Sequence, residues 1–278
     1  MRISLAAVIA LLATGVTGAP TVDEGKDADA IMDQIQSEAM GALVKAEKST
    51  PRRQGSECSV GNAHIRRDWE KLGQQEKLDY IRAVQCLADT PPKLTQYGWA
   101  NKNRLTINLG PITPRMDGLS PVGSIFEWNP RCLRRDLTMA ASRNLNAENL
   151  LNLTVGHASH NVQLFQDELQ GTRPDPPFLG MHGSGHFSMG ADGTDIYASI
   201  NDPAFWLHHA MLDRVYWAWQ ALHPAKKGKI AGGTVMREPD SPPAELSDLL
   251  DVMGLDNNKP IEDLLDTLGG TPLCYIYG

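Results

Sequence analysis

One stretch of the sequence combines helix signals with two histidines: Asn201-Asp202-Pro203-Ala204-Phe205-Trp206-Leu207-His208-His209-Ala210-Met211-Leu212-Asp213-Arg214. Asp202 is a favourable N-cap residue, and Pro203 suits the first turn of a helix. The pattern continues to Leu222 and stops before Pro224, so the sequence predicts a helix over 203–222. Residues at steps of four and three share one face of this helix: Phe205, His209, Leu212, Tyr216 and Trp219. The strongest predicted helix therefore places an imidazole on an otherwise apolar face.

A second pair of histidines precedes this helix, in His182-Gly183-Ser184-Gly185-His186. If this segment is helical, both imidazoles point the same way and can hold one ion. The surrounding stretch 174–193 is rich in Gly and Pro, which is typical of a loop. Because each Gly inside a helix costs about 1 kcal/mol relative to Ala, a helix here would need support from tertiary contacts or a metal.

Three imidazoles without a cysteine, those of His182, His186 and His209, suit copper, zinc, iron or nickel by ligand type. Asp213 lies four residues after His209, a spacing at which its carboxylate can accept the second ring N–H of that histidine. His208 is expected to diverge from His209 by about 100° around the helix, so we assign it to packing or to the surroundings of the site. The alternative for each residue is structural: a core histidine, a loop histidine, or an aspartate that pairs with an arginine.

The composition of the 278-residue chain is that of a globular protein, with 41% hydrophobic and 21% charged residues. It excludes collagen-like, coiled-coil and wholly disordered chains. The formal net charge of -7, without a long Lys/Arg run, argues against a nucleic-acid binder. Residues 1–19 combine a charged start, a short apolar run and small residues, which is typical of a secretory signal peptide. No later run reaches the roughly 20 apolar residues of a membrane helix, so we expect a secreted, extracellular protein.

The cysteines agree with an extracellular location. An exported chain with four cysteines favours two disulfides among Cys58, Cys86, Cys132 and Cys274, with three possible pairings. No two of them lie within five residues of each other, which argues against a cysteine-based metal site. Asn152-Leu153-Thr154 is a sequon for N-glycosylation and agrees with export.

The N-terminal part of the chain shows helical periodicity after the signal. Apolar spacing predicts an amphipathic helix over 27–48 and then a linker. The segment 20–56 is either a pro-segment or a helix that packs on the main domain. We expect a short helix over 66–72 and a longer one over 74–88. Four apolar residues of the longer helix form a predicted buried stripe: Leu78, Ile81, Val84 and Leu87.

Helical patterns return further along, over 147–153 and 159–169, and the chain closes on a short β-like run over 273–277. Between the helices expected over 74–88 and 147–153, residues 90–124 contain several Pro and Gly and show no persistent hydrophobic period. A loop of this length is unusual in a compact domain.

The sequence resembles secreted fungal tyrosinases at several places. The stretch 201–214 and the histidine pair of 182–187 are similar to the second copper motif of that family. Residues 67–87 are similar to the segment that precedes the first copper motif. Three further runs also resemble short fungal members: 105–111, 129–136 and Cys274-Tyr275-Ile276-Tyr277. The resemblance covers roughly residue 58 to the C-terminus.

The resemblance implies a mainly α fold over 57–278: an incomplete tyrosinase-like helical bundle with long loops and minor β structure. It implies a type-3 copper oxidoreductase that oxidises phenols or o-diphenols to o-quinones with O2. Carried over by position, His182, His186 and His209 bind the second copper, Asp213 lies behind His209, and Phe187 and Phe205 are candidates for an aromatic wall.

The first copper motif of the family has no counterpart here, because residues 88–106 contain no histidine. The histidines left over are His64, His157, His160 and His223. His157 and His160 could pair on a helix as substitute ligands, although their surroundings do not match the missing motif. Splicing, an error in the gene model and real loss each explain the gap, and a non-catalytic or mononuclear copper-binding relative is the alternative function.

Overall fold

A computed structural model of the chain describes residues 27–49, 57–90, 133–171, 179–195, 199–235, 240–252, 256–270 and 272–278. The expectations for the signal peptide, for most of the linker before residue 56 and for nearly all of 90–124 concern residues outside these ranges. The described part is mainly helical, as predicted. Its helices are α2 (Asp27–Ser49), α3 (Gln74–Asp89), α4 (Met139–Ser142), α5 (Ala147–Thr154), α6 (Val162–Gln170), α7 (Gly180–Met189) and α8 (Pro203–Leu222).

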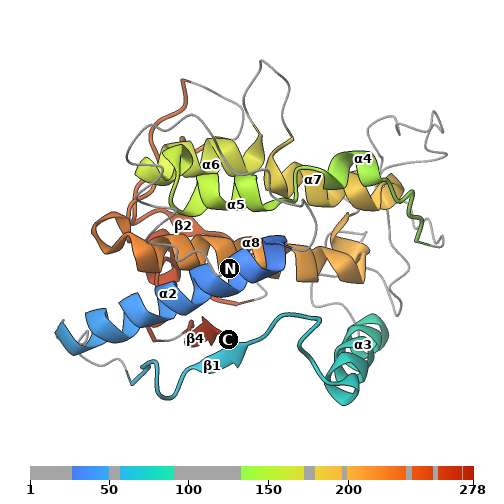
Figure 1. The fold of residues 1–278 in the computed structure, drawn as a ribbon, viewed down its shortest axis with the longest axis horizontal. Coiled ribbons are helices and arrows are strands. Elements are labelled where there is room, and N and C mark those ends of the chain that lie inside the picture. Colours follow the sequence, from blue (N-terminus) through green and yellow to red (C-terminus); the bar gives the residue numbers. More distant parts are fainter. Residues whose placement is uncertain are drawn as a thin grey trace.

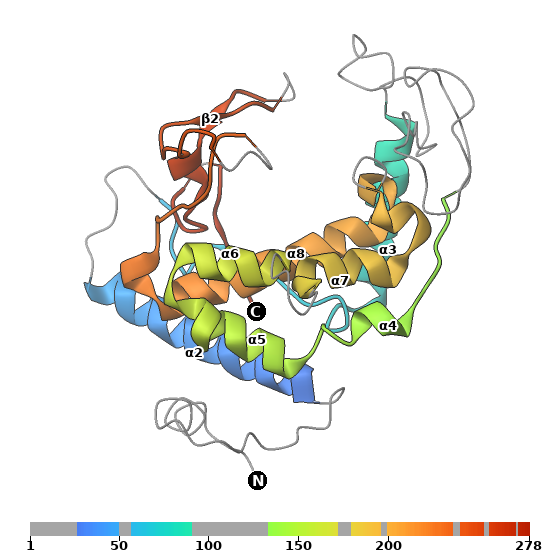
Figure 2. The ribbon, with the colours of Figure 1, turned by 90° about the horizontal axis from the view of Figure 1, so that it is seen from above.

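Helix α8 is the centre of the fold. It packs against α2 and α5 and also contacts α7 (Figures 1 and 2). Helix α6 lies against α7 and α5. The most deeply buried side chains come from four of these helices: Ile35, Leu153, Phe165, Val215 and Trp219. The predicted α8 is confirmed over 203–222, with Asp202 accepting a hydrogen bond from the N–H of Ala204 as its N-cap.

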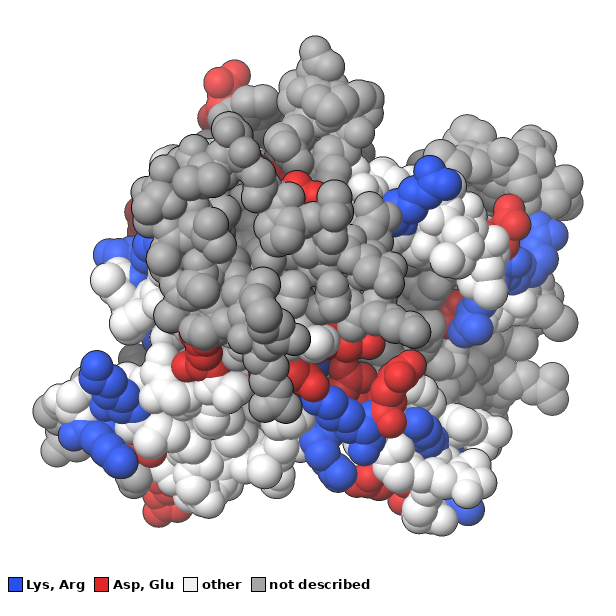
Figure 3. Space-filling view, in the orientation of Figure 1, with Lys and Arg blue, Asp and Glu red and all other residues white. Residues whose placement is uncertain are grey.

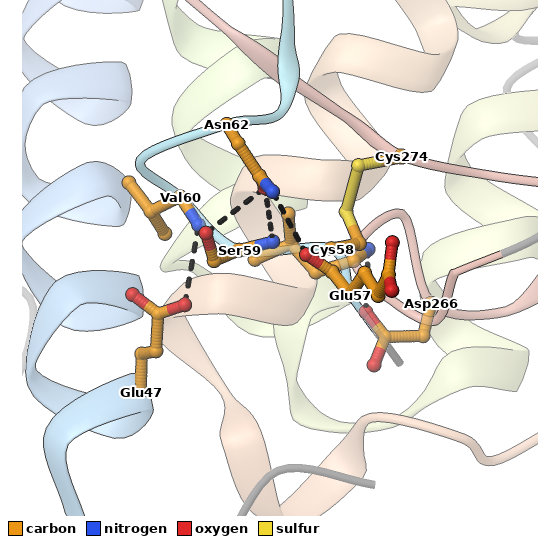
Figure 4. Close-up of a disulfide and its surroundings, with 9 residues drawn as sticks. Glu47, Glu57, Cys58, Ser59, Val60, Asn62, Asp266 and Cys274 are labelled. Atoms are coloured by element: carbon orange, nitrogen blue, oxygen red, sulfur yellow. Dashed lines mark hydrogen bonds between the residues drawn. A yellow bond between two sulfur atoms is a disulfide. The ribbon is translucent and has the colours of Figure 1, made fainter. Parts of the chain in front are cut away.

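The predicted N-terminal helix is also confirmed, as α2. Met32, Ile35 and Ala39 are buried in the hydrophobic core, so this helix packs on the main domain. At its C-terminal end, Glu47 accepts a hydrogen bond from the N–H of Val60, next to the Cys58–Cys274 disulfide (Figure 4).

One of the two expected disulfides forms in the structure, between Cys58 and Cys274. Cys86 is exposed on α3 and carries no disulfide, which contradicts a second bridge through this residue. Cys132 lies outside the described ranges. Asn152 of the sequon lies on α5, where its Oδ1 accepts a hydrogen bond from the N–H of Ala158; glycosylation there stays a prediction.

Two short sheets complete the described part. Strand β1 (His64–Arg66) pairs in parallel with β4 (Tyr275–Tyr277), with Ile65 opposite Ile276. Strands β2 (Leu249–Leu250) and β3 (Lys259–Pro260) are antiparallel. The β-like C-terminal run is thus confirmed. The short helix expected over 66–72 is wrong, because Arg66 ends a strand and turns follow it.

The predicted helix over 74–88 is confirmed as α3, which begins where the N–H of Gly73 donates to the Glu76 carboxylate. Its predicted buried stripe is wrong: Leu78, Ile81 and Leu87 are 40%, 45% and 72% exposed. Periodicity marks an apolar face, but it does not show whether another element covers that face. Helix α3 and the segment that carries β2 lie at opposite ends of the molecule (Figures 1 and 2).

Two helix predictions need smaller corrections. The helix expected from residue 159 begins at Val162, because Asn161 caps it by accepting from the N–H of Leu164, and a short 3-10 turn over His157–His160 precedes it. The loop expected over 174–193 contains α7 instead. No helix among the described residues is long and apolar enough to span a membrane. Acidic and basic side chains are intermixed on the face of the described residues seen in Figure 3.

Candidate metal centre

Helix α7 brings His182 and His186 to the same side, as their four-residue spacing predicts. Their rings are 4.8 Å apart between centroids, and the two Nε2 atoms are 3.1 Å apart. Ser184, between them in the sequence, is fully buried, and its Oγ accepts a 3.0 Å hydrogen bond from Asn144 on the neighbouring α4–α5 connection. Tertiary contacts of this kind offset the cost of two glycines in one helix.

Helix α8 adds two more imidazoles to this pair. The ring of His209 lies 5.2 Å from that of His182 and 5.1 Å from that of His186. The ring of His208 lies 5.9 Å and 5.1 Å from the same two rings. The structure therefore brings together all three predicted ligands, and His208 joins them as a fourth member. We call these four residues the histidine cluster.

The closest approach of ligand atoms involves His182, His186 and His208, whose ligand atoms all lie within 4.8 Å of one another. Within the ranges that the structure describes, this is the one group of three histidine, cysteine or acidic side chains close enough to hold a metal ion. His157 and His160 are not part of it, and Nδ1 of His160 is hydrogen-bonded to the carbonyl of His157. No finding supports these two as substitute ligands.

Three members of the cluster share one pattern of hydrogen bonding. Nδ1 lies 2.7 Å from Oε1 of Gln170 in His182, 2.9 Å from the carbonyl of Gly193 in His186, and 2.9 Å from the carbonyl of Phe205 in His209. Because these oxygens only accept, Nδ1 carries the proton in each ring. The lone pair is then on Nε2, the arrangement commonly found in metal-binding histidines.

His208 has the opposite arrangement. Its Nε2 donates to the carbonyl of His182 at 3.0 Å. The proton is therefore on Nε2, and the lone pair is on Nδ1. Among the four clustered imidazoles, His208 is the one whose Nε2 is hydrogen-bonded to a backbone carbonyl.

The surroundings favour the uncharged form of three members of the cluster, His182, His186 and His208. Burial, followed by the positive charges that His186 and His209 would carry, lowers the pKa of His182 to about 4. Burial also lowers the pKa of His208 to about 4, although its bond to the His182 carbonyl acts in the other direction. The pKa of His186 is lowered as well, chiefly by burial. Neutral imidazoles are the form that binds metals.

The predicted contact between Asp213 and His209 is wrong. Oδ2 of Asp213 accepts from the hydroxyls of Tyr275 and Tyr277 at 2.7 Å and 2.5 Å, and from Arg66 at 3.3 Å. His209 uses the carbonyl of Phe205, four residues earlier in its own helix. Asp213 therefore ties the C-terminal strand to α8. Burial, followed by this carboxylate, raises the pKa of both tyrosines.

Phe205 lies where an aromatic wall is expected. Its ring stacks on His209 with a centroid distance of 3.9 Å and is 5.7 Å from the ring of His186. Phe187, the other candidate, is half-buried on α7, and its role stays a prediction.

Sequence reasoning predicted Asp202 as the cap of α8 but missed Arg135, which holds its carboxylate. Arg135 donates two hydrogen bonds, at 2.7 and 2.6 Å, to the fully buried carboxylate of Asp202. Burial alone would raise the pKa of Asp202, but the hydrogen bonds and charge of Arg135, with the N–H of Ala204, lower it. Gln170 was missed too, because a glutamine twelve residues from its histidine gives no local signal.

A helical domain with imidazoles from two adjacent helices converging on one point is a candidate metalloprotein. Residues 36–222 match the family Tyrosinase, described as the common central domain of tyrosinase. The chain therefore belongs to the tyrosinase family.

Individual relatives agree with this assignment. The chain is similar to "Tyrosinase P" of Aspergillus terreus, with 34% identity over 176 residues that cover 62% of this chain and 48% of the relative. It is also similar to an N-acetyl-6-hydroxytryptophan oxidase of Emericella nidulans, with 33% identity over 161 residues that cover 55% of this chain and 43% of the relative. The chain thus spans about half the length of these curated relatives.

Among solved structures, a polyphenol oxidase (mutant G292N) from Thermothelomyces thermophila has the same fold. The TM-score is 0.68 at 22% identity, covering 92% of this chain and 98% of that one. This likeness shows the fold.

Proposed function

We propose that the chain is a copper-dependent oxidoreductase of the tyrosinase or catechol oxidase type, which oxidises phenols or o-diphenols to o-quinones with O2. In this proposal His182, His186 and His209 hold a copper ion through Nε2. The family match and the names of the relatives, a tyrosinase and a hydroxytryptophan oxidase, support the reaction class.

One observation carries the choice of ligands. In each of these three histidines, Nδ1–H donates a hydrogen bond to an oxygen, so the lone pair of Nε2 is free for a metal. The donor set fits copper, since imidazole is a suitable ligand for it. The depressed pKa of His182 and His186 favours the same fit, because proton competition for these rings is weak at neutral pH.

When bound, copper supplies the one-electron and O2 chemistry that side chains lack. The residues of the chain hold and orient the ligands. The bonds from Gln170, Gly193 and Phe205 fix the three rings, and the aromatic face of Phe205 beside His209 offers a surface for a phenolic ring. Arg135 and Asp202 fix the first turn of α8, which carries Phe205 and is followed by His209 in the next turn.

A second candidate function, copper binding at a single site without oxidase activity, is favoured by the histidine inventory. The chain has eight histidines, four of which form the histidine cluster. Of the others, Nδ1 of His160 is hydrogen-bonded to the carbonyl of His157, and Nε2 of His223 to the carbonyl of Thr154. None of these histidines belongs to a second group of ligands among the described residues. Two-electron oxidation by a pair of copper ions would need ligands beyond these four.

Copper content and oxygen uptake decide between the two candidates. The purified full-length chain is loaded with Cu(II), copper per chain is measured by mass spectrometry, and O2 uptake is followed with catechol and with a monophenol. Quinone formation that is lost in His209→Ala supports the oxidase. One copper per chain without O2 uptake overturns the oxidase and supports the second candidate, and no copper overturns both.

We also propose that the protein is secreted, which the disulfide and the sequence of residues 1–19 support. N-terminal sequencing of the protein from culture medium is expected to show a start close to residue 20. A protein that stays with the cells and keeps Met1 would contradict export.

A further inference from the structure

We propose that His208 is a positioning residue of the metal centre: it holds α7 against α8 and so sets where His182 lies relative to His209. This inference rests on the proposed copper site of His182, His186 and His209. His208 is distinct from those ligands in its hydrogen bond, in its ring contacts and in the glycine on which it packs.

The hydrogen bond joins the two helices at the ligands themselves. His208 is adjacent to His209 on α8, and its Nε2 donates to the backbone carbonyl of His182 on α7 at 3.0 Å. A carbonyl has no proton to give, so the bond requires the Nε2–H form of His208. One imidazole therefore connects the backbones of two proposed ligand residues.

The ring contacts of His208 add to this bond. The rings of His208 and His182 are nearly parallel, with a 6° angle between their planes and 5.9 Å between centroids. The ring of His186 meets His208 edge-on, at 87° and 5.1 Å. A movement of His208 would therefore disturb both ligands of α7.

Gly185 provides the space for this ring. A Cβ atom added to Gly185 would lie 2.1 Å from Cε1 of His208, 2.4 Å from Nδ1 and 2.5 Å from Nε2, which is closer than atoms can approach. A Cβ at Gly183 would lie 3.6 Å from Cβ of Leu179, an ordinary contact. The two glycines of His182-Gly-Ser-Gly-His186 thus differ: the approach of His208 requires Gly185 and does not involve Gly183.

The first test compares two side chains of similar size at position 208. The amide of His208→Gln can donate to the carbonyl of His182, and the side chain of His208→Leu cannot. Loss of a hydrogen bond behind a metal ligand typically weakens metal binding by about 10–100-fold. We therefore expect the Kd for Cu(II), measured against a competing chelator, to rise about 10-fold or more in His208→Leu and to stay within about 3-fold in His208→Gln.

Electron paramagnetic resonance of the Cu(II)-loaded proteins separates positioning from ligation. We expect the same number of coordinated imidazole nitrogens in the wild type and in His208→Gln. A nitrogen lost in both variants would make His208 a ligand and overturn the proposal. Equal Kd values for all three proteins, with lower melting temperatures in the variants, would show a purely structural residue and overturn it too.

The glycine pair provides matched controls. Both Gly185→Ala and Gly183→Ala improve intrinsic helix propensity by about 1 kcal/mol. We expect Gly185→Ala to raise the Kd for Cu(II) as His208→Leu does, and Gly183→Ala to leave it within about 2-fold of the wild type. Equal effects of the two substitutions would contradict a specific role of His208.

A last measurement uses the metal-free protein and so does not depend on the proposed function. Imidazole 15N–1H correlation spectra distinguish the two neutral tautomers. We expect Nε2–H for His208 and Nδ1–H for His182, His186 and His209. A wild type that shows these tautomers but takes up no copper would overturn the proposed function alone, whereas Nδ1–H in His208 would overturn the positioning role.

Discussion

Nε of Arg214 on α8 donates a 2.6 Å hydrogen bond to Oε1 of Gln36 on α2. The guanidinium, only 4% exposed, also donates to Asp68 at 2.9 Å and reaches Asp33 at 3.4 Å. A single buried cation thus joins the helix that carries His208 and His209 to the N-terminal helix and to the turn after β1. The N-terminal helix is in this way connected to the helix that carries two members of the histidine cluster.

Replacing this cation tests that connection. We expect Arg214→Leu to lower the free energy of unfolding by about 2–3 kcal/mol, because hydrogen bonds to charged groups contribute about that much. Arg82→Leu is the control, since Arg82 forms an exposed ion pair with Asp79 and such pairs contribute at most about 1 kcal/mol. The measurement is urea denaturation of the metal-free proteins. Equal losses in both variants would contradict a special role of Arg214.

The burial of α2 makes a second prediction about stability. Ile35 is fully buried, whereas Ile65 on β1 is 61% exposed. We expect Ile35→Ala to cost about 2–5 kcal/mol, as truncations in a well-packed core do, and Ile65→Ala to cost far less. A core contribution of this size would favour the alternative in which α2 is a helix of the folded domain over that of a removable pro-segment. If Ile35→Ala left the melting temperature unchanged, α2 would be dispensable, as a removable pro-segment would be.

The ligand assignment predicts which histidines matter for copper. We expect His209→Ala to weaken Cu(II) binding by more than about 100-fold, beyond the range for losing an outer hydrogen bond. His160→Ala should bind copper as the wild type does, because its ring nitrogen is bonded to the carbonyl of His157, outside the histidine cluster. Isothermal titration calorimetry of both variants with Cu(II) tests this. A loss of copper affinity in His160→Ala would instead support His157 and His160 as substitute ligands.

Gln170 is the one outer hydrogen-bond partner of the three proposed ligands that is a side chain, so mutation can remove it. We expect Gln170→Leu to weaken Cu(II) binding about 10-fold. Gln170→Glu should bind at least as tightly as the wild type, because a carboxylate makes the imidazole of His182 more basic. Gln163→Leu on the same helix is the control, since Gln163 bonds only to Asp167 among the contacts seen. Opposite changes in affinity for the Leu and Glu variants would be the signature of this bond.

The pKa of His182 predicts how the metal-free protein responds to acid. Its folded pKa is about 4, below the value of roughly 6.5 for an unfolded histidine. Between these values the unfolded chain binds more protons, so this residue's contribution to stability is complete above about pH 6.5 and is lost as the pH falls towards 4. We expect the unfolding free energy of His182→Asn to fall less steeply with acidification than that of the wild type. Parallel curves between pH 4 and 6.5 would contradict the shifted pKa.

The parts of the fold that the sequence predicts well are those set by neighbouring residues. Helix α8 has its cap at Asp202, its first-turn proline and its terminating Pro224 within one continuous stretch, and its observed bounds are the predicted ones. The parts that were wrong depend on distant residues. Strand β1 exists because it pairs with β4 at the other end of the chain, and α7 is helical because Ser184 and Gly185 pack on other elements.

The same distinction between local and distant residues applies to the candidate site. The spacing of His182 and His186 predicts their convergence, since a helix brings residues four apart to one side. The partner of Asp213 could not be predicted, because spacing allowed His209 and only the tertiary structure brings the hydroxyls of Tyr275 and Tyr277 to the carboxylate. His208 was expected in packing or in the surroundings of the site, but its ring contacts with His182 and His186 could not be predicted, because divergence around one helix does not exclude contact with a neighbouring helix.

The Cys58–Cys274 bond joins residues 216 positions apart in the sequence. All eight histidines lie between these two cysteines, so the whole histidine inventory belongs to one closed covalent ring. A protease that cuts this ring once, anywhere along its length, produces two peptides that stay attached. Such nicked protein would migrate as two fragments on a reducing gel but as one band without reductant, and its histidine cluster would stay on a single molecule.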